Sequence, residues 1–302
     1  TRRWASLAVS APPALYLNND CLLVIDGGSW TAFSSYGGGF VPLTTAANPT
    51  LLNGAAAVID SVLLVADATH VHALSALAGT WSARPLAGAY SASVQRHVAI
   101  VAQANVVSAF NAFTGTWHDL AVAVTPAAVS ADGTAAVAYG SGRVYAFSAL
   151  HGVWREHPAL PGAAFARGDD WAVWYTNNMQ LGFSAIRAGF GRAHHAVSTP
   201  IFAEDLFGMF DGAGGVFAFS AFTGTFSGVV AAPGTVVARR SATAVLVDGA
   251  GTRAYSAVVN AAFPCPIPAV SSGLGTDAAW VRDSSGPPWF FSSLLGAWYA
   301  PP

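Results

Sequence analysis

Large apolar residues recur along this chain at a nearly constant interval, inside a short motif that appears eight times. Its clearest copies run from Val71 to Trp81, Val107 to Trp117, Val144 to Trp154 and Val216 to Phe226. In each copy, the large apolar residue before a serine or asparagine serves as the anchor. The anchors are Phe33, Leu74, Phe110, Phe147, Phe183, Phe219, Tyr255 and Phe291, separated by 41, 36 and 37 residues and then four times by 36. A repeat of this period predicts one structural unit per copy.

Each copy contains four short strand-like segments, A to D, separated by turn residues. In the second copy they are predicted over Ala55 to Ile59, Val62 to Ala66, His70 to Ala76 and Thr80 to Pro85. Segment B is an unbroken apolar run in most copies, which predicts a strand buried on both faces. An aromatic residue follows the anchor by seven positions in seven of the eight copies, and with the anchors it is assigned to the core between sheets. This predicted core contains Phe33, Trp81, Phe110, Trp117, Phe147, Trp154, Phe183, Phe219, Phe226, Phe291 and Trp298.

Segments C and D are joined by a turn with the pattern Ser-Ala-x-x-Gly. Its last position holds glycine in six copies, Ala188 in the fifth and Asn260 in the seventh. Glycine and asparagine adopt positive φ most readily, so positive φ is predicted at this position. The serine after the anchor, replaced once by Asn111, is expected to hydrogen-bond the backbone of the turn. Both features are assigned to the fold and not to catalysis.

Four antiparallel strands repeated eight times predict a single all-β domain over residues 1–302, an eight-bladed β-propeller of four-stranded blades. An open solenoid is the alternative, but no copy has the polar composition of a terminal cap. Trp4 precedes the first anchor by 29 residues, the distance at which Trp81, Trp154 and Phe226 precede later anchors. Residues 1–8 are therefore predicted to form an extra D-like strand. This strand lies fifth in a blade, stays loose, or pairs with an edge strand of a neighbouring molecule.

Composition narrows the function classes. The chain has 13 basic residues, all arginine, 15 acidic residues, and a charged fraction of only 9%. Without a basic stripe, it is not expected to bind nucleic acid. The uncharged stretch from Gly212 to Ala238 is long enough to cross a bilayer, but it carries glycines, a proline and hydroxyl residues in phase with the repeat, so strands are predicted there and no transmembrane segment. Cys21 and Cys265 are too few for a disulfide framework or a zinc site.

Polar residues in the turns are the first candidates for a binding site. The predicted B–C turns carry Asp26, Asp67, Gln103, Asn177, Asp211, Asp248 and Asp283, which a propeller would place in a ring on one face. Such a ring could hold a cation or sugar hydroxyls. However, Asp-Gly is the preferred composition of two-residue hairpin turns, so a structural role is favoured. The A–B turns collect most of the remaining charge, including Asp20, and are expected to be solvated.

Histidines are the second set of candidates. His70 and His72 alternate on a predicted strand, so both imidazoles would point to one face and could share a metal ion, although no third ligand is close in sequence. His118, His157, His194 and His195 fall in predicted D strands, where surface positions are expected. The chain contains no nucleophile elbow, catalytic Cys-His pair or phosphate loop, so no catalytic, metal-binding or cofactor-binding residue is predicted.

The segments VYAFSALHGVW and VFAFSAFTGTF resemble the repeats of quinoprotein (PQQ)-type propellers, in which an apolar-Tyr-Ala-Leu-Asp-Ala-x-Thr-Gly hairpin leads to a tryptophan. The resemblance covers nearly the whole chain and implies eight blades. Serine replaces the family's aspartate, and the shorter step from glycine to tryptophan is also similar to the turns of sialidase-like propellers. Dehydrogenases of the family use adjacent cysteines and an acidic calcium cluster around the quinone, which have no counterpart here. The resemblance therefore implies the non-catalytic branch, whose members act as scaffolds.

These observations favour a non-catalytic structural or interaction propeller without a cofactor. Sparse charge and the surplus strand favour a subunit of a larger assembly that is extracellular, at the cell surface or periplasmic. Its expected partners are other protein subunits, including copies of itself that pair through edge strands. Two alternatives are a carbohydrate-binding propeller with shallow pockets between blades, whose partner would be a glycan, and a degenerate quinoprotein-type enzyme.

Overall fold

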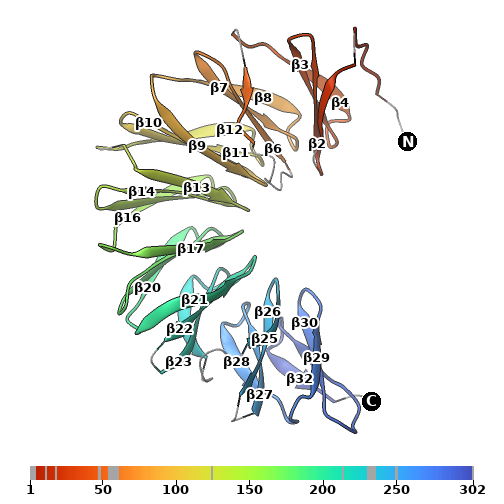
Figure 1. Ribbon diagram of the computed structural model, residues 1–302, viewed down its shortest axis with the longest axis vertical. Coiled ribbons are helices and arrows are strands. Elements are labelled where there is room, and N and C mark those ends of the chain that lie inside the picture. Colours follow the sequence, from red (N-terminus) through yellow and green to blue (C-terminus); the bar gives the residue numbers. More distant parts are fainter. Residues whose placement is uncertain are drawn as a thin grey trace. The chain divides into compact units, whose positions relative to one another are not determined.

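The computed structural model describes residues 5–10, 12–17, 19–46, 49–53, 61–123, 125–212, 214–229, 236–248 and 251–300. The chain forms two compact units, Thr1–Pro158 and Ala159–Pro302. Each unit contains four sheets, and each sheet is made of four consecutive antiparallel strands (Figure 1). Within the described ranges there is no helix, and hence none that could span a membrane.

The first unit contains sixteen strands in four sheets. The first two sheets are β1 (Ala14–Leu17), β2 (Cys21–Asp26), β3 (Ser29–Ser34), β4 (Gly39–Leu43) and β5 (Thr50–Leu51), β6 (Val62–Ala66), β7 (His70–Ser75), β8 (Thr80–Pro85). The next two are β9 (Tyr90–Gln95), β10 (Val98–Gln103), β11 (Val106–Asn111), β12 (Thr116–Ala121) and β13 (Ala128–Asp132), β14 (Ala135–Gly140), β15 (Arg143–Ser148), β16 (Val153–Pro158).

The second unit repeats this plan with sixteen more strands. Its first two sheets are β17 (Ala164–Gly168), β18 (Trp171–Tyr175), β19 (Gln180–Ser184), β20 (Gly189–Ala193) and β21 (Val197–Ala203), β22 (Phe207–Gly212), β23 (Gly215–Ser220), β24 (Thr225–Val229). Its last two are β25 (Val236–Arg240), β26 (Thr243–Asp248), β27 (Gly251–Ser256), β28 (Ala261–Pro264) and β29 (Ser271–Leu274), β30 (Ala278–Arg282), β31 (Trp289–Ser292), β32 (Ala297–Tyr299).

Eight consecutive four-stranded antiparallel sheets are the blades of a β-propeller, and the predicted fold class is confirmed. The stretch that is long enough to cross a bilayer contains β23 and β24, as the repeat predicts. That residues 1–302 form one domain stays a prediction, since the chain divides into two compact units.

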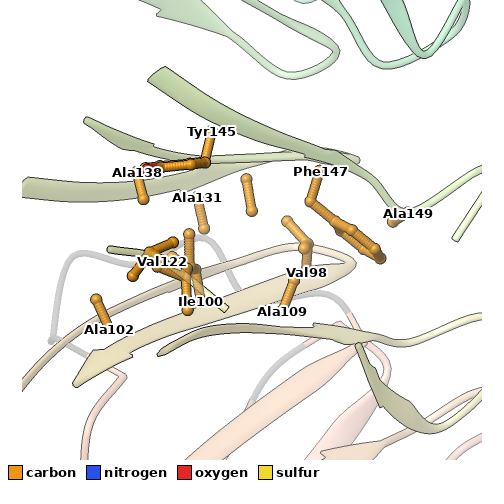
Figure 2. Close-up of a cluster of buried hydrophobic side chains, with 12 residues drawn as sticks. Val98, Ile100, Ala102, Ala109, Val122, Ala131, Ala138, Tyr145, Phe147 and Ala149 are labelled. Atoms are coloured by element: carbon orange, nitrogen blue, oxygen red, sulfur yellow. The ribbon is translucent and has the colours of Figure 1, made fainter. Parts of the chain in front are cut away.

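The middle strands of each sheet form the core. β6 and β10, both B strands, are buried at every position, which confirms the expectation from their unbroken apolar runs. Between the sheets of β10 and β14, Val98, Ile100 and Ala109 pack in one cluster with Ala138 and Phe147 (Figure 2). The aromatic ring of the anchor thus packs against small and branched side chains of the sheet before it. Burial of these apolar side chains is the main contribution to the stability of the fold.

The aromatic residue seven positions after the anchor packs first on its own sheet. It pairs directly with the anchor across strands C and D, and the ring centroids of six such pairs are 4.8–5.3 Å apart. Where this residue is tryptophan, its indole Nε1 also donates to a carbonyl of the preceding sheet. Trp81, Trp117, Trp154 and Trp298 bond in this way to the carbonyls of Val41, Ser82, His118 and Phe263.

The residue after the anchor makes two hydrogen bonds. Its side chain accepts a backbone N–H of its own C–D turn, as predicted, for example from Ala78 to Ser75 Oγ at 2.9 Å. It also donates to a carbonyl of the next sheet, which the sequence did not reveal. These donors are Ser34, Ser75, Asn111, Ser184, Ser220 and Ser256, and they bond to the carbonyls of Ala76, Ala112, Ala149, Ala221, Ala257 and Ser293.

The predicted backbone conformation of the C–D turn is confirmed in all eight copies. φ is between 60° and 69° at the six glycines, 48° at Ala188 and 57° at Asn260. Asn260 also takes part in a local network, because its Oδ1 accepts the hydroxyl groups of Tyr255 and Ser227 at 2.7 and 2.8 Å. Burial raises the pKa of the Tyr255 phenol, so it stays a hydrogen-bond donor.

Two strand predictions differ from the structure. Ala5–Ala8, the described part of the extra D-like strand, pairs with no strand and is exposed, while residues 1–4 lie outside the described residues. The first strand of the second sheet is β5, which pairs with Val65 and Ala66, and the predicted segment Ala55 to Ile59 lies outside the described residues.

Candidate functional site

The structure places all seven candidate turn residues at B–C hairpins. Asp26, Gln103 and Asp248 end their B strands, and Asp211 is the penultimate residue of β22. Asp67 and Asp283 directly follow their B strands, and Asn177 is the second residue after β18. The first three along the chain belong to the first unit and the other four to the second. Their arrangement in one ring stays a prediction.

The aspartates of the Asp-Gly pairs do not occupy the turn positions that the sequence predicted. Asp26 pairs with Ser29 as the last residue of the strand, so the two turn residues are Gly27 and Gly28, both with positive φ. Asp211 pairs with Val216 and Gly212 pairs with Gly215, so the turn begins after Gly212. Backbone pairing between strands B and C continues through the aspartate, and the residues that follow it form the turn.

Three of the candidates hold the segment that enters their blade. Asp26 accepts the backbone N–H of Ser10 at 2.7 Å, and Asp67 accepts that of Ala46 at 2.8 Å. Gln103 accepts the N–H of Ala87 at 2.8 Å. Because all three stand seven residues before their anchors, this is a repeated structural contact, in agreement with the favoured structural role.

A second clamp was missed by sequence reasoning. Gln180 and Thr252 stand three residues before their anchors, in C strands, and hold the segment that leaves their blade. Gln180 bonds both backbone groups of His195, at 2.8 and 3.2 Å, and Thr252 Oγ1 accepts the N–H of Ala269 at 2.9 Å. The signal in the sequence was a polar side chain at a position of strand C that is buried.

Asp67, His70 and His72 form a group of ionisable side chains at one B–C turn. His72 is buried with its Nε2 2.9 Å from Asp67 Oδ2, and the ring centroids of the two histidines are 5.8 Å apart. Although burial alone would raise the pKa of Asp67, hydrogen bonds from His72 and from three backbone amides lower it well below its ordinary value. The His72 side chain is therefore a hydrogen-bond partner of the Asp67 carboxylate. No group of three or more potential metal ligands occurs in the part of the chain that the structure describes.

Only two of the four histidines that were predicted in D strands lie in such strands. His118 lies in β12 and His157 in β16, but His194 and His195 follow the end of β20, because the chain leaves the sheet after Ala193. His195 stacks on Phe217 with ring centroids 3.9 Å apart, and burial lowers its pKa. His118 is also partly buried against Phe147.

A serine, a histidine and an aspartate meet at the A–B turns of the first unit, which sequence reasoning missed. Ser61 Oγ donates to Asp20 Oδ2 at 2.8 Å and lies 3.0 Å from His97 Nδ1. In a hydrolytic triad the histidine stands between the serine and the acid. Here the buried Ser61 is in the middle, so Asp20 does not orient the imidazole. The group instead connects the turns of three consecutive blades.

An open groove of about 500 Å³ lies in the second unit, at the B–C end of β18. Its walls are Pro161, Gly162, Ala164, Tyr175, Thr176, Asn177, Asn178 and Val197. Val197 donates its backbone N–H to the Asn177 carbonyl, which links the turn to the next sheet. Burial raises the pKa of Tyr175, and no charged side chain lines the groove. Of the seven predicted turn residues, the groove contains only Asn177.

Exposed apolar side chains gather at the C–D turns. The third and fourth residues after the anchor include Tyr36, Phe113 and Leu150 in the first unit, and Val259, Leu294 and Leu295 in the second. These six side chains are between 43% and 69% exposed. Sequence reasoning treated this turn only as a structural motif, although a large apolar residue follows every anchor by three positions.

Comparison with known proteins supplies no family. No family model matches the chain, and no curated protein matches its sequence. Solved structures with similar folds include BamB from Moraxella catarrhalis (12% identity, 85% of this chain and 87% of that chain, TM-score 0.33). Another is Hsv2p from Kluyveromyces lactis (11% identity, 82% and 93%, TM-score 0.31), and a third is the designed protein Ika8 (12%, 80% and 83%, TM-score 0.30). The chain's own sheets define its class, the β-propellers, and the resemblance to quinoprotein-type repeats stays a prediction.

Proposed function

We propose that this protein is a non-catalytic β-propeller that binds other proteins, as a subunit of an assembly outside the cytoplasm. The observation that carries the proposal is the set of exposed apolar side chains on the C–D turns. Single exposed apolar residues are ordinary on protein surfaces, but the recurrence of large ones at one turn in several blades is typical of a contact surface.

The repeated polar side chains support the same proposal. The serines after the anchors, Asp67 and Gln103 hold turns and linking segments together, so their side chains are engaged within the fold. Ser61 is buried, and its hydroxyl donates to the Asp20 carboxylate and contacts His97, so it helps join the A–B turns. The polar atoms of these groups are therefore engaged in positioning the backbone.

Site-specific photocrosslinking in the cells that make the protein tests this function. A photoreactive residue at Tyr36, which is 62% exposed, should give one adduct of defined mass. The matched control is the same residue at Val270, 68% exposed but outside the C–D turns. Equal adducts from both positions, or none from Tyr36, would overturn the proposal.

The groove favours carbohydrate binding as a second candidate function. An aromatic ring from Tyr175 beside the amides of Asn177 and Asn178 offers stacking and hydrogen bonds to a neutral sugar, and no charge has to be desolvated. Calorimetric titration with neutral glucan hexasaccharides should show binding that Tyr175→Ala abolishes and Tyr175→Phe largely retains. Equal affinity of wild type and Tyr175→Ala would exclude this site.

A further inference from the structure

One wall of the groove in the second unit is formed by the segment that links β20 to β21. Residues 194–196 directly precede Val197, a buried residue that lines the groove. Gln180 on β19 fixes the backbone of this segment through its two hydrogen bonds to His195. The Val197 N–H donates to the Asn177 carbonyl at 3.2 Å. The position of this wall therefore depends on a short segment that contains two histidines.

The His195 side chain packs against the next sheet, β21 to β24. Its imidazole stacks on the Phe217 ring, with ring centroids 3.9 Å apart and the ring planes inclined by 16°. The segment lies close to this sheet, because a Cβ on Gly212 would come within 2.3 Å of the Ala196 carbonyl oxygen and 2.5 Å of the Phe217 ring. The imidazole ring and the backbone of the segment thus pack on one patch of β22 and β23.

A second wall of the groove, Tyr175, is connected to the same stack of rings. The ring centroids of Tyr175 and Phe210 are 5.6 Å apart, and Phe210 pairs with Phe217 across β22 and β23. These three side chains and Val197 belong to one apolar cluster between two sheets of the second unit. The contact between His195 and Phe217 therefore supports both walls.

β21, which begins at the groove, is attached irregularly to its sheet. Its pairing with β22 shifts register between Val197 and Thr199, and again between Pro200 and Phe202. Such bulges interrupt the hydrogen-bond ladder, so the pairing of Val197 with Gly212 is separated from the other pairs of the strand. Displacement of the segment thus disturbs one residue pair and leaves the remaining pairs of β21 in place.

We propose that His195 makes this groove sensitive to pH: its neutral imidazole keeps the wall in place, and its protonation releases the segment from Phe217 and weakens ligand binding. A charged imidazole loses solvation where a ring and the backbone cover it, and a charged His194 beside it adds repulsion. The inference rests on the carbohydrate-binding candidate and adds the regulation of that site.

The charged residues of the neighbouring strands point away from this contact. Asp211 on β22 pairs with Val216, and these two side chains lie on the face opposite to Phe217. That face packs on the following sheet. Arg192 on β20 pairs with Leu181, whose side chain lies on the face of its sheet opposite to the groove. Neither side chain is therefore placed to compensate a charge on the imidazole.

The direction of the pH dependence follows from the proton balance. Burial and the charge of His194 lower the pKa of His195 in the stacked arrangement, whereas a released imidazole has its ordinary pKa of 6.5. The released form therefore binds more protons, so the stack is fully favoured above pH 6.5 and is progressively lost as the pH falls below it. Tyr175 stays neutral in this range, because burial raises its pKa.

Nuclear magnetic resonance of the full chain without a ligand tests the release of the segment. Between pH 8 and pH 5, the Val197 methyl signals should shift with the same midpoint as the His195 ring signals. His195→Phe keeps an aromatic ring on Phe217 without a titratable group and should abolish this shift. Val197 signals that do not titrate, or that titrate equally in His195→Phe, would overturn the inference.

Calorimetric titration with a neutral glucan hexasaccharide measures the consequence for binding. Wild type should bind about three- to tenfold more weakly at pH 5 than at pH 7.5, and His195→Phe should bind equally at both. The matched control is His194→Gln, which removes the neighbouring charge but not the stack. It should keep the pH dependence, with a midpoint closer to 6.5.

The outcomes separate the switch from the site. Binding at both pH values with equal affinity would overturn the inference and retain the carbohydrate candidate. Tighter binding at pH 5 would overturn it as well, since Phe217 would then hold the imidazolium as a cation. Absence of binding at every pH would overturn the carbohydrate candidate, and the experiment without a ligand would still decide whether His195 moves the wall.

Discussion

Asp67 shows how strongly a single residue is fixed in this fold. Its carboxylate is almost completely buried and accepts hydrogen bonds from the backbone of Ala46, Thr69 and His70 and from His72. These nearby hydrogen-bond donors compensate the cost of burying the charge. The same hydrogen bonds hold the B–C turn and the segment that enters the blade. An aspartate before a turn was visible in the sequence, but these partners depend on how the hairpin closes.

The lowered pKa of Asp67 predicts acid sensitivity. A carboxyl group whose folded pKa lies below its unfolded value stabilises the fold above the unfolded pKa, near 4, and this contribution is lost as the pH falls toward the folded pKa. Denaturant unfolding from pH 6 to 2 should therefore show a steeper acid loss for wild type than for Asp67→Asn. At pH 6 the variant should be less stable by about 1–3 kcal/mol. Parallel pH profiles would contradict this assignment.

Gly182 makes a second prediction for a single residue. Any Cβ there meets the Phe219 ring, so Gly182→Ala should destabilise the protein by about 1–3 kcal/mol through overpacking. Gly189→Ala in the same sheet is the matched control, since its Cβ would make only an ordinary contact at 3.7 Å. Thermal and chemical unfolding check the pair, and equal stabilities of the two variants would refute the packing argument.

Strands and turns are the level at which the sequence was most informative. The period, the four strands and the positive φ at Ala188 and Asn260 could be predicted because each follows from local pattern and turn chemistry. The contacts between sheets could not. Asp20 and Ser61 are 41 residues apart, and nothing near either residue in the sequence indicates that they meet. The extra strand was predicted from its spacing alone, which does not determine whether the segment pairs with a sheet.

Asn111 tests the hydrogen bonds that join successive sheets. It replaces the usual serine, and its amide both accepts the N–H of Phe113 and donates to the carbonyl of Ala149 at 2.7 Å. Asn111→Ser restores the common residue and should change stability by less than about 0.5 kcal/mol. Asn111→Ala removes the donor to the carbonyl of the buried Ala149 and the acceptor of the Phe113 N–H, and should cost about 1–3 kcal/mol. Similar stabilities of the two variants, by denaturant unfolding, would show that this bond contributes little.

At the scale of the whole molecule, the proposed function depends on exposed surfaces. The turn residues that the sequence singled out serve the fold in three blades, whereas the exposed residues on the C–D turns were hidden in an apolar pattern. Exposure depends on which sheet covers which, and a sequence with 53% hydrophobic residues does not separate covered from uncovered positions. The candidate surface could therefore be recognised only in the structure.

The native mass of the protein in the cells that make it tests the central claim most directly. Tagged full-length chain, isolated under mild conditions, should appear in a complex larger than the chain alone. The variant Tyr36→Ser, Phe113→Ser, Leu150→Ser should lose that complex, while a control with serine at Val9, Tyr90 and Val270, also exposed but outside the C–D turns, should keep it. A wild-type mass no greater than that of the chain alone, or a complex that survives the triple turn variant, would contradict the account.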